Sequence, residues 1–238
     1  MNVQWEAAWQ AVIHHPLFGV AITLAAFQLS YAAYEKTRWV FLQPVLVSML
    51  MVVGVLLACG LGYEDYRLSA QMLTVMLGPA TVALAVPLYL NLRRIRELFG
   101  PIMITLLVGG ITATALGMAL AWAFGADRMV LMTLAPKSVT SPIAMLVAEQ
   151  IGGVVALAAV FVMITGILGA IFGPELLRRF GVQHPAARGM ALGLTAHAVG
   201  TAQALQESEE CGALAALAMS LMGVLTAVLL PLAVSLSL

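Results

Sequence analysis

Charged side chains are scarce in this chain of 238 residues. Lys, Arg, Asp and Glu together make up 9% of it, whereas 62% is hydrophobic and the mean hydropathy is +1.02. An average soluble domain is about 25% charged, so this chain has too few polar side chains to coat a water-facing surface. Composition therefore predicts an integral membrane protein. Eleven basic residues balance eleven acidic ones without any long basic run, which excludes nucleic-acid binding.

Signals for catalysis and for metals are also missing. The two cysteines, Cys59 and Cys211, stand alone in or beside apolar sequence, without the spacing of a disulfide framework or a metal site. The chain has no phosphate-binding loop, no nucleophile elbow and no pair of histidines four residues apart. We therefore predict that the protein is not an enzyme and holds no cofactor or metal.

Long stretches without Asp, Glu, Lys or Arg are the main positive feature. A bilayer core needs ~20 apolar helical residues, and backbone groups in lipid must bond within the segment. The sequence therefore predicts an all-α integral membrane protein with seven to eight helical segments, including proline-broken or re-entrant helices. The windows are Ala7–Tyr34, Trp39–Tyr63, Leu68–Leu92, Leu98–Ala126, Met129–Ala148 (interrupted only by Lys137), Gln150–Pro174, Gly189–Gln206 and Cys211–Leu238.

Basic loops predict the orientation, because such loops face the cytoplasm. Two of them lie at Arg93–Arg96 and Arg178–Arg188, and a third at Lys36–Arg38. An even number of crossings must separate the first two, yet three windows lie between them. We therefore expect the Met129–Ala148 window to enter the membrane and return, or to break midway. The acidic group Glu207–Glu210 is expected on the opposite side.

Glycines recur at intervals of 56 to 57 residues and predict an internal repeat of helix pairs. They lie at Gly54, Gly110, Gly166 and Gly223. We expect a single transmembrane domain over residues 1–238, with an N-terminal interfacial segment at 1–13, a first half at 14–126 and a second half at 129–238.

Lys137 is the most informative residue, because a lone ammonium in an apolar window needs compensation. Pro136 and Pro142 bracket it together with the hydroxyls of Ser138, Thr140 and Ser141. Prolines interrupt the helix, and the start of the following half-helix carries partial positive charge. The pattern predicts an anion pocket suited to a carboxylate. The alternative is a Lys137 side chain that extends to the interface beside a simple kink.

Two further constellations could line the same pocket. His197 and Thr201 share one helical stripe, and Gln203 follows; a structural interhelical hydrogen bond is the alternative role for His197. Pro79 and Thr81 mark a second proline-broken span, which the repeat would place opposite Lys137; kinks without function are the alternative.

Taken in order, these motifs resemble the LrgB/CidB family. They are the 136–145 stretch, Gly152-Gly153, Thr165-Gly166-Ile167, Gly173-Pro174, the 196–202 stretch, Gly212-Ala213, the 217–219 stretch and 77–85. The family includes antiholin-like bacterial inner-membrane proteins and the membrane domain of the plastid glycolate/glycerate translocator. Gln203 stands where a basic residue is associated with the family, and Ser141 replaces a frequent threonine.

The resemblance implies a multi-pass protein of the bacterial inner membrane that carries small monocarboxylates such as glycolate, glycerate or pyruvate. It also implies a small holin-like partner of the LrgA/CidA type. The alternative function is a non-transporting, antiholin-like regulator of murein hydrolase export and lysis. Coupling to protons or to sodium and assembly as a homodimer are further expectations.

Overall fold

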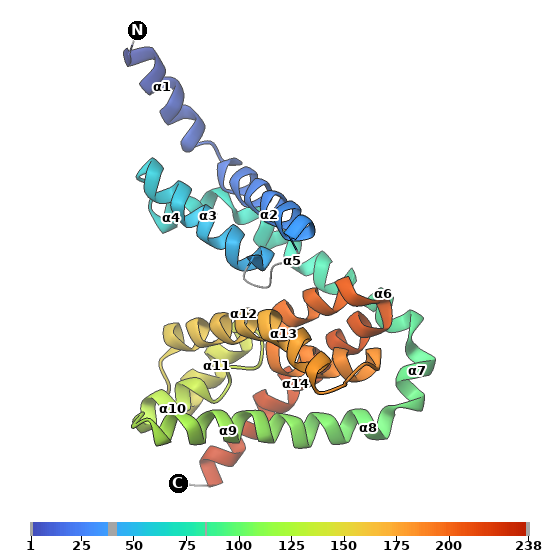
Figure 1. Cartoon of the computed structure of the whole chain (residues 1–238). Coiled ribbons are helices and arrows are strands. Elements are labelled where there is room, and N and C mark those ends of the chain that lie inside the picture. The colour runs from blue at the N-terminus through green and yellow to red at the C-terminus, as the bar shows by residue number, and fades with distance from the viewer. Residues whose placement is uncertain (1, 38–41, 84, 237–238) are drawn as a thin grey trace. The chain divides into compact units, whose positions relative to one another are not determined.

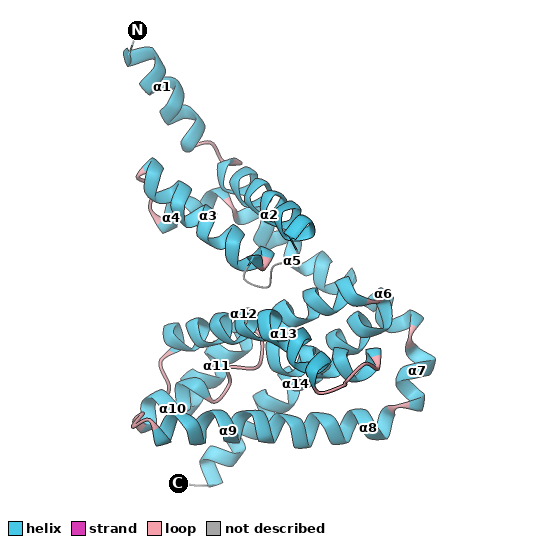
Figure 2. Ribbon diagram, in the orientation of Figure 1, coloured by secondary structure: helices cyan, strands magenta, loops and turns pink. Residues whose placement is uncertain are grey.

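The computed structural model describes residues 2–37, 42–83 and 85–236, all of them in helices, turns and loops (Figure 2). Each of the eight predicted windows contains helix, which confirms the all-α fold class. The chain divides into two compact units, Met1–Ala83 and Leu84–Leu238. The predicted single domain, with halves that meet near residue 126, stays a prediction.

The first unit contains five helices among its described residues (Figure 1). The α2 helix packs on α3, and Gly19 lies so close to Ser69 that a side chain at position 19 would meet the Ser69–Ala70 backbone. Gly60 closes α3 in the left-handed conformation, and α4 leaves α3 at an angle of 115°. The helices are α1 (Asn2–Ile13), α2 (Phe18–Thr37), α3 (Pro44–Cys59), α4 (Tyr63–Ser69) and α5 (Gln71–Ala83).

The second unit is built around long apolar helices. Within the described residues, three are long and apolar enough to cross a membrane: Phe99–Ala123, Val155–Arg179 and Glu209–Leu236. The bent pair α3–α4 of the first unit would be a fourth if counted as one span. The elements are α6 (Ala85–Leu90), α7 (Leu92–Glu97), α8 (Phe99–Ile104), the π-helical turn η2 (Thr105–Gly109), α9 (Gly110–Ala123), α10 (Arg128–Leu134), α11 (Ser141–Ile151), α12 (Val155–Arg179), α13 (Pro185–Glu207) and α14 (Glu209–Leu236).

The α13 helix folds back on itself at His197. Arg188 and Glu207 near its two ends form a 2.6 Å ion pair, although 19 residues of straight helix would separate them by about 28 Å. Packing on α14 gives the same result. Gly189 and Gly193 meet the carbonyls of Cys211 and Ala215, so the first half of α13 runs parallel to α14. The second half runs antiparallel to α14. Thr201 contacts Met219, and Leu205, one turn further along α13, contacts Gly212, which comes seven residues before Met219 in α14.

A shorter helical hairpin precedes α12. It consists of α10, a break over residues 135–140, and α11, which ends at Gly152 in the left-handed conformation. The chain then returns to α10, because the Val154 amide donates a 2.8 Å hydrogen bond to Thr133 Oγ1 and Gly153 packs on the Thr133 backbone. Neither α10 nor α11 is long enough to cross a bilayer. The Met129–Ala148 window thus breaks midway and folds back on itself, as expected for a segment that enters the membrane and returns.

Ion pairs place the ends of the long helices. Arg94, just before α8, contacts His184, just before α13, and Glu210 at the start of α14. The second span, α12, therefore runs opposite to the first and third spans (Figure 1). The expectation that Glu207–Glu210 faces away from the basic loops is wrong, because α13 returns to its starting side at His197 and brings these carboxylates to the arginines.

The second unit contains two copies of one structural motif. A span followed by a hairpin occurs twice, as Phe99–Ile151 and Val155–Glu207, and the two copies run in opposite directions. Gly110, Gly166 and Gly223 each lie in one of the three spans, where they contact Met222, His197 and Ile143 respectively. Glycine at these positions lets side chains from neighbouring elements reach the helix backbone. The order is that of an inverted repeat, as found in secondary transporters.

Candidate functional site

Lys137 lies at the apex of the first hairpin, in the turn that joins α10 to α11. Its ammonium donates to the Ala113 carbonyl at 3.4 Å and to Ser138 Oγ at 3.3 Å. The carbon stem packs against Gly117 of α9, where an added Cβ would fall 2.8 Å from Lys137 Cε. Among the ion pairs of the described residues, none includes Lys137.

The depth of this ammonium separates the two roles considered for Lys137. Ala113, whose carbonyl it contacts, lies within the span Phe99–Ala123. At 1.5 Å per residue, that carbonyl is about 15 Å from the Ala123 end and about 21 Å from the Phe99 end. The ammonium therefore lies beside the middle of this apolar helix, which favours the pocket role over extension to the interface. A cation at this depth is expensive unless a counter-charge reaches it.

The predicted polar side chains surround this apex along the chain. Ser138 is buried, and Thr140 is the N-cap residue of α11 without a side-chain bond to the helix amides. Ser141 opens α11 and Pro142 occupies its first turn, where the missing N–H costs nothing. Pro136 is buried in the break itself. The fold therefore places a lysine, three hydroxyls and a half-helix start at one break.

His197 lies at the apex of the second hairpin. Its backbone has φ 42° and ψ −127°, and it is the only non-glycine residue with positive φ in the described ranges. Such a conformation costs roughly 1–3 kcal/mol and persists only where packing imposes it. The ring is buried against Gly166, and Nε2 lies 2.9 Å from the Val162 carbonyl of α12. This is the interhelical hydrogen bond that the sequence left open as the alternative role.

Thr201 follows one turn later and supports the break. Its hydroxyl donates to the His197 carbonyl at 2.8 Å, which satisfies an acceptor beside the kink, and lies 3.8 Å from Met219 Sδ. Gln203 is half-buried in the second half of α13. The stripe predicted for a straight helix therefore runs down one limb of a hairpin instead.

The two apices meet the same apolar core but are not bonded to each other. Val139 beside Lys137, Leu194 before His197 and Val162 of α12 belong to one buried cluster. Lys137 bonds to α9 and His197 to α12, so each apex is held by a different span. A single pocket that contains both side chains stays a prediction.

The third predicted constellation lies in the first unit. Pro79 sits inside α5, which continues to Ala83, so the expected helix break at Pro79 is wrong. The Thr81 side chain lies outside the described residues. Its placement opposite Lys137 stays a prediction.

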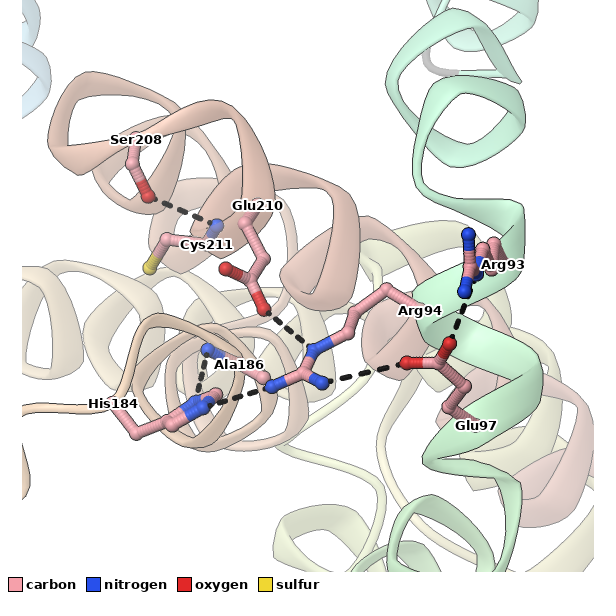
Figure 3. A network of polar contacts seen from close by, with 8 residues as sticks. All are labelled: Arg93, Arg94, Glu97, His184, Ala186, Ser208, Glu210 and Cys211. Atoms are coloured by element: carbon pink, nitrogen blue, oxygen red, sulfur yellow. Dashed lines mark hydrogen bonds and ion pairs between the residues drawn. The ribbon is translucent and has the colours of Figure 1, made fainter.

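A cluster of charges on the arginine-rich side was missed by the sequence reasoning. Arg94 contacts Glu97, Glu210 and His184 from three separate segments (Figure 3). Nearby, Arg188 donates to both oxygens of Glu207, and this bond raises the pKa of the Arg188 guanidinium. Arg188 and Glu207 lie at the two ends of one apolar stretch, but a helix through that stretch would hold them far apart. Their pairing can therefore be recognised only from the turn at His197.

Two of the hollows among the described residues of the second unit are lined by residues outside the predicted site. One, of about 260 Å³, is an apolar groove between α9 and α14 that contains the unpaired Thr226 hydroxyl. The other, of about 320 Å³, separates α8 from the first half of α13, and His184 lies at its edge.

Comparison with known proteins agrees with the resemblance found in the sequence. The chain is 36% identical to the uncharacterized protein YxaC of Bacillus subtilis (strain 168), over 90% of this chain and 94% of that protein. It is 30% identical to the antiholin-like protein LrgB of Bacillus cereus (strain B4264), over 91% and 94%. No solved structure matches it. The model of the LrgB-like family covers residues 23–236, and the chain belongs to this family.

Proposed function

We propose that this protein is a secondary carrier for small monocarboxylates, such as glycolate, glycerate or pyruvate. The observation that carries the proposal is the Lys137 ammonium, which lies about 15 Å inside a span and forms none of the ion pairs among the described residues. A transported anion would supply the counter-charge that the described part of the chain does not. Its carboxylate would bind Lys137 and the hydroxyls of Ser138, Thr140 and Ser141.

The inverted arrangement of the two hairpins supports a carrier over a static binding protein. Carriers with such repeats bind substrate at broken helices near the bilayer midplane, where half-helix starts face anionic groups. In this proposal His197 and Thr201 fix the second apex. Coupling to protons or to sodium and assembly as a homodimer remain parts of the proposal.

The test is counterflow of labelled glycolate, glycerate or pyruvate into proteoliposomes. Lys137→Ala should lower uptake by about 10- to 150-fold, because it removes hydrogen bonds to a charged group worth ~1.5–3 kcal/mol. The matched control is Lys36→Ala, which replaces the only other lysine, an exposed one in the last turn of α2. Equal uptake by both variants would remove Lys137 from the mechanism.

A second function is favoured by the name of the relatives, which are described as antiholin-like. In that case the chain would regulate murein hydrolase export and lysis together with a small holin-like membrane protein. This function predicts no saturable exchange by the purified protein and a phenotype that depends on the partner. Saturable counterflow by the protein alone favours the carrier, whereas unselective leakage favours the regulator.

A further inference from the structure

The second hairpin is closed at its base by a charged bond. Arg188 Nε and Nη2 donate to the two oxygens of Glu207 at 2.6 and 2.9 Å, and Nη1 donates to the Val182 carbonyl at 3.1 Å. The two side chains are only 16% and 22% exposed. Planar, two-point bonds of this kind are the strong form of a salt bridge. We refer to the Arg188–Glu207 pair as the latch.

A second connection lies beside the latch. Arg94 donates to Glu210 at 3.3 Å and lies 3.1 Å from His184 Nε2, so it joins the start of α14 to the segment that leads into α13 (Figure 3). Ser208 Oγ accepts from the Cys211 amide and caps the start of α14. These bonds hold α14 and its surroundings in place, whereas the latch joins the two limbs of the hairpin to each other.

The first hairpin has no such charged closure. The charged residues near its ends, Arg128 and Glu149, are both exposed, and neither belongs to an ion pair among the described residues. That hairpin is closed instead by the neutral bond from the Val154 amide to Thr133, which is fully buried. Thr133 is fully buried, so no water can take the place of its partner, whereas the latch side chains keep 16% and 22% of their surface exposed and water can replace the bonds between them. The two inverted copies are therefore closed by bonds of different reversibility.

Room for movement lies on the side of the latch. The hollow of about 320 Å³ is lined by Thr105 on one side and by Ala187 and Met190 of the first limb on the other. The opposite face of this limb covers Cys211, which is 1% exposed and whose carbonyl meets Gly189. Cys211 belongs to a buried cluster with Leu192 of the first limb and Ala204 of the second, so separation of the two limbs would expose its thiol.

We propose that the Arg188–Glu207 latch is a gate, which opens the second hairpin on the arginine-rich side and so leads the substrate toward the apolar core that this hairpin shares with the Lys137 hairpin. This inference rests on the proposed carrier function. The structure has the gate closed. Opening exchanges the charged bond for hydration and moves the first limb of α13 away from α14.

Cys211 reports on this movement without any substrate. In a Cys59→Ala background it is the only thiol of the chain, so its rate of reaction with a maleimide in detergent measures the open fraction. The double variant Arg188→Gln/Glu207→Gln removes both charges of the latch. Because the Cys211 thiol itself donates to Glu207 at 3.8 Å, the rates of all variants are compared per thiolate, with the thiolate fraction of each variant taken from the pH dependence of its labelling. We expect it to react at least about tenfold faster than the parent, since charged hydrogen bonds are lost. The swap Arg188→Glu/Glu207→Arg should react slowly again.

The control is Glu175→Gln/Arg179→Gln, which removes the two ion pairs that Glu175 forms with Arg178 and Arg179 within α12, on the same side of the protein. It should react at the parental rate. A neutral latch that reacts as slowly as the parent, or a swap that reacts as fast as the neutral latch, would overturn the gate. Because labelling needs no transport, a gate that behaves as expected beside absent counterflow would instead count against the carrier function.

Discussion

Replacement of Gly193 by alanine tests the close packing on which the second hairpin depends. A Cβ at this position would lie 2.7 Å from both the carbonyl carbon and the Cα of Ala215 and closer still to its oxygen. The obstructing atoms belong to the backbone of α14 and cannot rotate away as a flexible side chain could. The first limb of α13 must therefore separate from α14 to accept the methyl group.

Two opposing contributions set the magnitude. Alanine is favoured over glycine within a helix by about 1 kcal/mol. Overpacking costs about 1–3 kcal/mol, and a backbone obstacle places this site at the upper end of that range. We expect Gly193→Ala to lower the free energy of unfolding by about 1–2 kcal/mol net. The control Gly54→Ala lies in α3 with nothing within 4 Å of its Cβ, so helix preference alone should raise stability by about 0.5–1 kcal/mol.

Reversible unfolding in mixed micelles, followed by circular dichroism, measures both variants under identical conditions. The two substitutions add the same methyl group and should change stability in opposite directions. A Gly193→Ala protein as stable as the parent would refute the close contact between Gly193 and the backbone of α14.

Two further predictions concern the first hairpin. Thr133→Val removes the hydroxyl that accepts from the Val154 amide and should destabilise the protein by about 1–3 kcal/mol in chemical unfolding. The control is Thr195→Val, because the exposed Thr195 hydroxyl bonds to a carbonyl of its own helix; its stability should stay within about 0.5 kcal/mol of the parent. Equal effects of the two substitutions would contradict the closure by Thr133. Gly117→Ala places a Cβ 2.8 Å from Lys137 Cε and should displace the ammonium, which raises the KM of carboxylate counterflow about tenfold, or ~1.4 kcal/mol. Gly100→Ala, with nothing near its Cβ, is the control, and an unchanged KM in Gly117→Ala would argue against substrate binding at Lys137.

The first hairpin could be predicted because its break has a local cause. Pro136 lacks the amide that would continue α10, and Pro142 is favoured at a helix start. The two prolines together favour a break at Lys137, whereas the single Pro79 is accommodated inside α5. The parity of crossings between the basic loops then requires this window to return. Both arguments use residues near each other in sequence, which is why the sequence sufficed.

The second hairpin could not be predicted in this way. The 189–206 stretch contains no proline, and its spacing is that of an unbroken helix. His197 adopts positive φ only because Gly166 leaves space for its ring, Val162 bonds its Nε2 and Thr201 bonds its carbonyl. Gly166 and Val162 belong to α12 and not to the helix that contains His197, so no residue near His197 in the sequence signals the turn.

The sequence by itself determined the membrane class, the eight helical windows, the broken helix at Lys137 and the family, because these depend on composition, on local stereochemistry and on motifs in order. Only the tertiary structure decided the depth of the Lys137 ammonium, the turn at His197 and the pairing of Arg188 with Glu207. These features depend on contacts between residues far apart in the chain. A helix that is apolar on all sides has no amphipathic pattern, so its sequence does not indicate which face a neighbouring helix will cover.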